Sequence, residues 1–104
     1  MINKDKCLEL GLPEPKSYQS ELSYCLSVML SGVKLNTWQT RYIGIGHLHN
    51  HTSVLKKKGY QFEDPKAPSY CPEAKKILPR PVINAFMMPD QIALYWQEKA
   101  ARKG

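Results

Sequence analysis

The sequence predicts an α+β fold in which a three-helix core is followed by a two-stranded β-hairpin and a C-terminal helix. Three observations favour this fold. An apolar stripe of helical period fills residues 18–31, glycines stand where successive helices would end, and apolar residues alternate with polar ones after residue 59. The chain has 104 residues, of which 42% are apolar, and this suits one domain with a modest core.

The first core helix is expected over residues 18–31. Ser17 is a suitable N-cap, because its hydroxyl can accept a hydrogen bond from a free amide of the first turn. Gly32 follows the helix at the position where glycine enters the left-handed region at little cost. The apolar stripe has members three and four residues apart, and they are Leu22, Cys25, Leu26, Met29 and Leu30.

The second core helix is expected over residues 37–42, after a short extended segment at residues 33–35. Either Asn36 or Thr37 can cap this helix. Two glycines around one isoleucine, at residues 44–46, predict a tight turn that keeps the isoleucine buried. This turn leads directly into the next helix.

The third core helix is expected over residues 47–58, and Gly59 ends it. Its inward stripe consists of Leu48, His51 or Thr52, and Leu55. Its outward face carries His49, Asn50, Ser53, Lys56 and Lys57. These outward side chains form hydrogen bonds or carry positive charge, so this face suits contact with base edges and phosphates. Lysines in a last turn are also favoured by the helix dipole alone.

A strand is expected at residues 60–62, and its partner at residues 82–88. The proline- and lysine-rich connection at residues 63–81 would then form a long wing, with a helical turn near residues 72–78. A final helix is expected from Pro89 and Asp90 to about residue 102, because proline and aspartate both suit a first turn.

The expected organisation has three parts. Residues 1–16 form a loose arm or short strand, residues 17–88 form the domain, and residues 89–104 form a C-terminal helix that packs on the same domain. A short helix with two large aromatic residues needs a surface to cover. The chain is therefore expected to be a monomer, or a homodimer joined through this helix.

Positive charge is concentrated in the second half of the chain. Residues 1–52 carry five Lys or Arg and four Asp or Glu, whereas residues 53–104 carry ten and five. The net charge of +6 favours polyanionic partners, nucleic acid first. Solubility alone is the simpler explanation of a basic composition, and charge does not decide between the two.

The expected location is the cytoplasm. Three widely spaced cysteines without metal-ligand spacing are typical of reduced thiols, and Cys25 falls on an apolar helix face. The N-terminal residues lack the apolar segment of a signal peptide, and no apolar run approaches the length of a membrane span. No membrane association is expected.

The segment from residue 22 to residue 63 resembles the winged helix-turn-helix domains of small phage- and prophage-encoded proteins. The matching residues are Gly32, Leu35, Thr37, Gly44, Ile45, Leu48, Thr52, Leu55, Lys57, Lys58, Gly59 and Tyr60. The resemblance covers under half of the chain. It implies a winged helix-turn-helix fold and binding to double-stranded DNA in transcription control or replication.

The site hypothesis places the third core helix in the DNA major groove. The expected base-edge contacts are His49, Asn50 and Ser53. The expected phosphate contacts are Lys34, Arg41, His47, Lys56 and Lys57, joined by Lys75, Lys76 and Arg80 from the wing. Phosphate contacts set affinity, and base contacts set sequence preference.

Metal binding and catalysis are less favoured. On a helix, His47 and His51 share a side while His49 points away, so three histidines cannot meet one ion. Two histidines with Cys71 or a carboxylate remain an alternative, and His49 as a pH-dependent DNA contact is another. No nucleophile motif, phosphate-binding loop or dinucleotide-binding motif is present. The sequence therefore predicts a protein that is not an enzyme and needs no metal or cofactor.

The stronger alternative is an adaptor that uses the same fold to bind a host or phage protein. Trp38, Tyr95 and Trp96 would serve such an interface if they were exposed, and they would otherwise be core residues. Salt separates the two hypotheses. DNA binding through several Lys and Arg weakens steeply as salt rises, whereas an aromatic protein interface does not.

Overall fold

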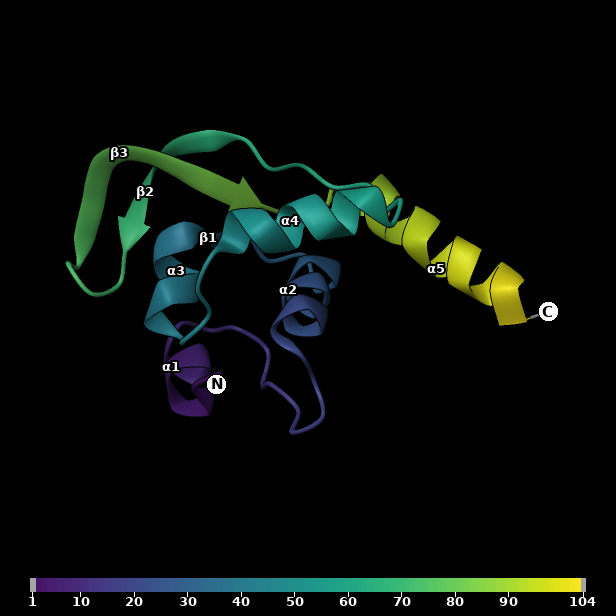
Figure 1. Ribbon diagram of the computed structural model, residues 1–104, viewed down its shortest axis with the longest axis horizontal. Coiled ribbons are helices and arrows are strands. Elements are labelled where there is room, and N and C mark those ends of the chain that lie inside the picture. The colour runs from purple at the N-terminus through teal and green to yellow at the C-terminus, as the bar shows by residue number, and fades with distance from the viewer. Residues whose placement is uncertain (1, 104) are drawn as a thin grey trace.

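Residues 2–103, which the computed structural model describes, form an α+β structure of five helices and a three-stranded antiparallel sheet. In chain order the elements are α1 (Lys4–Glu9), α2 (Glu21–Leu30), β1 (Leu35–Asn36), α3 (Thr37–Tyr42), α4 (Leu48–Lys57), β2 (Lys66–Cys71), β3 (Lys76–Ala85) and α5 (Pro89–Lys103). Helices α1 to α4 gather beneath the β2–β3 hairpin, and α5 extends away from them (Figure 1). Met1 and Gly104, the outermost residues of the expected arm and C-terminal segment, lie outside the described residues.

The sheet has the strand order β1-β3-β2, so the short strand before α3 pairs with the second strand of the hairpin. Leu35 lies opposite Ala85, and Tyr70 lies opposite Ile77. The register shifts between Ala67 and Ser69, because β3 carries extra residues there. This irregularity bends the hairpin, as a β-bulge does.

The hairpin differs from the expected long connection between two short strands. Residues 60–62 are not a strand, and only an isolated bridge between Glu63 and Phe86 precedes β2. Most of the expected wing at residues 63–81 lies in strands β2 and β3, and the chain reverses in a short turn at residues 72–75. The sequence did not predict these strands, because proline has no N–H to donate to a neighbouring strand. The prolines are tolerated because β2 is an edge strand and because Pro79 and Pro81 fall where the ladder is interrupted.

The N-terminal segment also differs from the expected arm or strand. Asn3 caps α1 by accepting a hydrogen bond from the Lys6 amide at 3.0 Å. Cys7 and Leu12 are buried in the core beside α2. Two apolar anchors and a cap are enough to order a helix that is too short to be stable by itself.

The core helices follow the expected order, with small changes at their ends. Helix α2 begins after Ser20 rather than Ser17, because the Ser20 hydroxyl accepts from the Ser23 amide at 3.1 Å. The range Thr37–Tyr42 is confirmed for α3. Helix α4 begins one residue later than expected and ends one residue earlier. Gly32, Gly44 and Gly59 all have positive φ after the helices that they end.

Two apolar clusters form the core. The first joins α1, α2 and the turn before α4, and Ile43 and Ile45 are fully buried within it. The second joins α2, α4 and β3 through five buried residues, Met29, Leu55, Phe62, Ala85 and Met87, and Ile92 of α5 packs against it. The expected burial of Cys25 and of Ile45 is confirmed. Ile83 packs against both clusters, so β3 ties them together.

Asn36 connects the helical core to the hairpin. Its side-chain Oδ1 accepts a hydrogen bond from the backbone N–H of Gln39 at 2.9 Å, and its backbone N–H donates to Gln39 Oε1 at 2.8 Å. These two hydrogen bonds form a capping box for α3. Its Nδ2 donates to the Tyr70 carbonyl of β2 at 3.3 Å. One buried side chain therefore fixes both the start of α3 and the position of the hairpin.

Replacing Asn36 by Ala should lower the free energy of unfolding by about 2–3 kcal/mol, from the lost cap and the unpaired groups left behind. Urea unfolding followed by circular dichroism measures this change. Asn50→Ala is the matched control, because Asn50 is exposed on α4 and its loss should change stability by less than about 0.5 kcal/mol. Equal stabilities of the two variants would contradict the role assigned to Asn36.

Burial changes the titration of the thiols in the first cluster. Removal from water, with a smaller contribution from Glu21, raises the pKa of Cys25 from 9.0 to about 12. Burial also raises the pKa of Cys7, against a smaller opposing effect of its hydrogen bond with Tyr24. Both thiols are therefore neutral in the folded protein at ordinary pH.

The raised thiol pKa predicts a loss of stability in alkali. Between about pH 9 and about pH 12, the unfolded Cys25 thiol gives up its proton while the folded one retains it. The free energy of unfolding should therefore fall as pH rises, by up to about 1.4 kcal/mol per pH unit from this group. Urea unfolding at about pH 8 and about pH 10 measures the slope. Cys25→Ala should reduce the slope and leave the part that Cys7 contributes, and an unchanged slope in that variant would show that other groups cause it.

Candidate nucleic-acid interface

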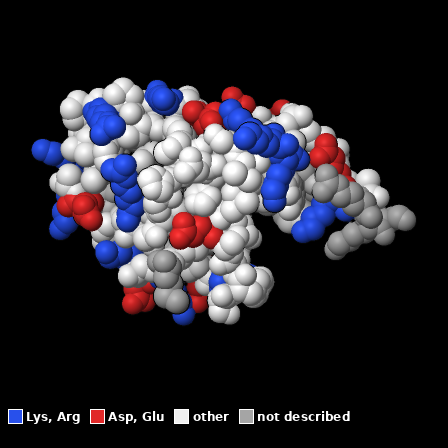
Figure 2. All heavy atoms as spheres, viewed as in Figure 1, with Lys and Arg blue, Asp and Glu red and all other residues white. Residues whose placement is uncertain are grey.

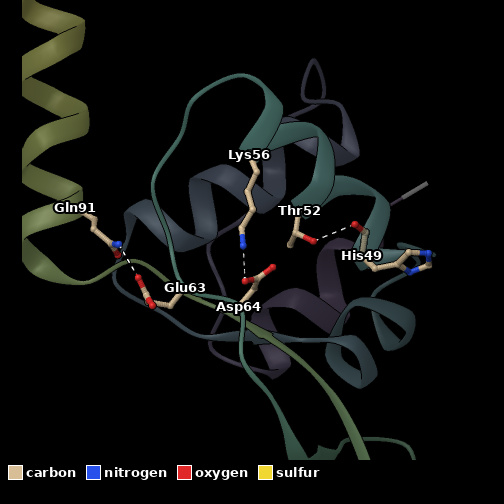
Figure 3. Close-up of polar contacts among 6 residues, drawn as sticks. All are labelled: His49, Thr52, Lys56, Glu63, Asp64 and Gln91. Atoms are coloured by element: carbon tan, nitrogen blue, oxygen red, sulfur yellow. Dashed lines mark hydrogen bonds and ion pairs between the residues drawn. The ribbon is translucent and has the colours of Figure 1, made fainter.

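Helix α4 is held against the body by one side only. Leu48, Thr52 and Leu55 are buried, and with about 3.6 residues per turn they lie on one face. The Thr52 hydroxyl keeps a hydrogen bond although it is buried, because it donates to the His49 carbonyl at 3.0 Å (Figure 3). The opposite face of α4 is consequently free to meet another molecule.

Asn50, Ser53, Val54 and Lys57 are exposed and occupy the face of α4 opposite the buried stripe, here called the α4 outward strip. His49 is also exposed, but it lies at the flank of the strip and its side chain points away from the core (Figure 3). The structure thus brings together all three residues expected to contact bases. Val54 was not among the expected contacts, although its helical spacing places it beside Asn50 and Lys57.

The histidines have three different environments. His47 has a φ of 55° just before α4, and its ring meets that of His49 edge-on at 5.9 Å. Of the two residues offered for the inward stripe, Thr52 is buried and His51 is half-buried, with its Nε2 3.5 Å from Glu21 Oε1 of α2. Among residues 2–103, no three His, Cys, Asp or Glu side chains are grouped so that they could hold a metal ion.

Lys56 is already bound within the protein. Its Nζ lies 2.7 Å from Asp64 Oδ1, and it also lies 5.5 Å from the centre of the Phe62 ring (Figure 3). Asp64 belongs to the segment that leads into β2, so this pair fastens the end of α4 to the base of the hairpin. Lys57, which carries no such pair among the described residues, is the freer cation on the outward strip.

The other expected phosphate contacts lie on the hairpin side of the molecule, and all of them are exposed. Lys34 covers the Phe86 ring at 5.0 Å, and the Arg41 guanidinium lies 5.4 Å from the centre of the Trp38 ring. Lys75 has a φ of 56° in the hairpin turn. Lys76 begins β3, and Arg80 stands between two prolines where the register shifts.

These cations form two groups. In Figure 2, Lys and Arg gather over the hairpin and over the C-terminal end of α4, with Asp and Glu between them. Helix α4 itself contains no carboxylate. The acidic residues beside it, Glu21 and Asp64, are each paired with a residue on one of its flanks. The outward strip therefore has no unpaired acid of its own to repel a polyanion.

The final helix is anchored at its beginning. Gln91 Nε2 donates to Glu63 Oε2 at 2.8 Å (Figure 3), and Ile92 packs against the second core cluster. The ring centres of Tyr95 and Tyr60 are 5.8 Å apart. Beyond this point the helix projects from the body (Figure 1), and Trp96 is 49% exposed.

Comparison with known proteins finds no family model, no curated protein and no solved structure that matches this chain. A search of residues 2–103 likewise finds no helix with the length and apolar character needed to cross a membrane.

Removing the Asp64 charge should release Lys56 for external anions. Asp64→Asn is expected to bind random duplex DNA more tightly and to raise the salt dependence of binding by about one counterion. Glu98→Gln is the matched control, because it changes the net charge equally on the exposed surface of α5. Fluorescence anisotropy at several salt concentrations compares them. Identical behaviour of the two variants would mean that Lys56 does not reach DNA.

Proposed function

We propose that this protein is a winged helix-turn-helix domain that binds double-stranded DNA in a sequence-dependent way, as a regulator of transcription or replication from a phage or mobile element. The observation that carries the proposal is the α4 outward strip. It presents hydrogen-bonding and cationic side chains without an unpaired carboxylate. Such a helix suits insertion into a major groove.

The order of elements supports the winged arrangement. Helix α2, strand β1, helices α3 and α4 and then the hairpin follow one another as such a domain requires. Strand β1 pairs with the second hairpin strand, which holds the hairpin beside the helix-turn-helix unit. The turn between α3 and α4 is short, and Ile45 anchors it in the core.

Each side chain of the outward strip has a role in this proposal. Asn50 can pair with the N6 and N7 edge of adenine, Ser53 can bond to several bases, and Val54 can contact a thymine methyl group. Lys57 and the hairpin cations would hold phosphates on either side of the groove. Lys56 contributes less, because Asp64 competes for it.

A protein-binding adaptor is the second candidate, and the exposed Trp96 on the projecting part of α5 favours it. Trp38 and Tyr95 contribute less than expected to this alternative, because both are half-buried. Aromatic residues at the centre of an interface would give binding that changes little with salt.

The deciding experiment begins with selection of bound duplexes from a random pool, followed by anisotropy titrations at two salt concentrations. Lys57→Ala should weaken binding to all sequences and lower the salt slope by about one. Asn50→Ala should chiefly reduce discrimination between selected and random duplexes, by about 1–3 kcal/mol. Lys16→Ala, on the exposed N-terminal loop, is the control for loss of one positive charge.

Absence of any enriched sequence, or binding that does not respond to salt, would refute the DNA proposal. If Asn50→Ala binds and discriminates like the parent protein, the outward strip does not read bases. Retention of binding in Lys57→Ala with the same slope as Lys16→Ala would remove the phosphate role of Lys57.

A further inference from the structure

A hollow of about 400 Å³ lies between α3 and the end of the hairpin. One wall is formed by Trp38 and Arg41 of α3, and the other by Glu73, Ala74 and Leu78 of the hairpin, with the buried Cys71 beside them. This volume is within the range of small-molecule sites. The hollow belongs to neither the outward strip nor the final helix.

The two charged groups of the hollow have opposite signs and come from opposite walls. Neither Arg41 nor Glu73 takes part in an ion pair within residues 2–103. Arg41 covers the Trp38 ring, and Tyr42 of the same helix lines the hollow together with Glu73. The hydrogen bond to Glu9 is the main cause of the raised pKa of Tyr42, and the charge of Glu73 raises this pKa further.

Trp38 adds a donor without an acceptor. Its Nε1–H is the one buried side-chain polar atom without a hydrogen-bond partner in the described part of the chain. A buried donor left unpaired is unfavourable, and such groups in native proteins call for an explanation. Trp38 also forms one wall of the hollow, although its Nε1–H is itself buried.

We propose that the hollow between α3 and the hairpin binds a small zwitterion, namely an α-amino acid with an apolar side chain. Its carboxylate meets Arg41, its ammonium group meets Glu73, and its side chain rests on Ala74 and Leu78. A simple anion would use Arg41 alone and leave Glu73 opposed to it. An uncharged apolar molecule would remove both charges from water without pairing either, which is unfavourable.

Isothermal titration calorimetry with four probes tests this proposal on the full chain. L-leucine at millimolar concentration should bind, and N-acetyl-L-leucine and L-leucinamide, which each lack one charge, should bind at least ten-fold more weakly. Inorganic phosphate should not bind at this site. Equal binding of L-leucine and N-acetyl-L-leucine would identify a plain anion site, and absence of heat with every amino acid would reject the site altogether.

Substitutions locate the binding and separate it from folding. Arg41→Gln and Glu73→Gln should each weaken L-leucine binding at least ten-fold. Arg80→Gln, on the same hairpin but outside the hollow, should leave the affinity unchanged. Circular dichroism verifies that each variant is folded. Full affinity in Arg41→Gln and Glu73→Gln would overturn the proposal, and because no nucleic acid is present the result is independent of DNA binding.

Discussion

The attachment of the hairpin to the helical core depends on the Asn36 side chain. It closes the first turn of α3 and reaches across to the Tyr70 carbonyl of β2, while its backbone lies opposite Asn84 of β3. Asn84 in turn donates to Ser69 Oγ at 2.8 Å, so a second polar contact links β3 with β2. Buried polar groups that satisfy one another favour one arrangement over others, because displaced alternatives leave donors and acceptors unpaired. These contacts orient the hairpin relative to α3 and α4 together with Ile83, which packs against both core clusters, and the Lys56–Asp64 pair.

Sequence reasoning succeeded where a local chemical signal decides the structure. Positive φ values require glycine after the helices, and the buried Ile45 fixes the turn between α3 and α4, so these features were predictable from residue type and spacing. The exposure of Asn50 and Ser53 followed from helical period alone. Long-range contacts decided the rest. Nothing local in Pro68 or Pro79 reveals that their strands pair, and nothing near Lys56 reveals that Asp64 will bind it.

Two buried threonines, Thr40 of α3 and Thr52 of α4, have their hydroxyl groups satisfied within the helices that carry them. Thr40 and Thr52 are both buried, and each hydroxyl donates to the carbonyl three residues earlier, at 2.8 Å for Thr40 and 3.0 Å for Thr52. Each hydroxyl is satisfied within its own helix, so neither needs water or a partner from the other helix. The arrangement of the two helices is therefore compatible with polar residues that would otherwise be unfavourable in a core.

The distribution of charge matters more for function than the net value of +6. Three acidic residues lie near the path from α2 to the hairpin, and each has a partner: Glu21 with His51, Asp64 with Lys56, and Glu63 with Gln91. Pairing of this kind contributes little to stability when it is exposed, so its effect is mainly on where the free charge remains. Lys57 on α4 and the hairpin cations are exposed, and Figure 2 shows Lys and Arg gathered over the hairpin and over the end of α4, with Asp and Glu between them. A polyanion that approached the outward strip would meet positive charge at both ends and neutral hydrogen-bonding groups between them. In the proposed function, the cations would hold phosphates, and the neutral groups would contact base edges.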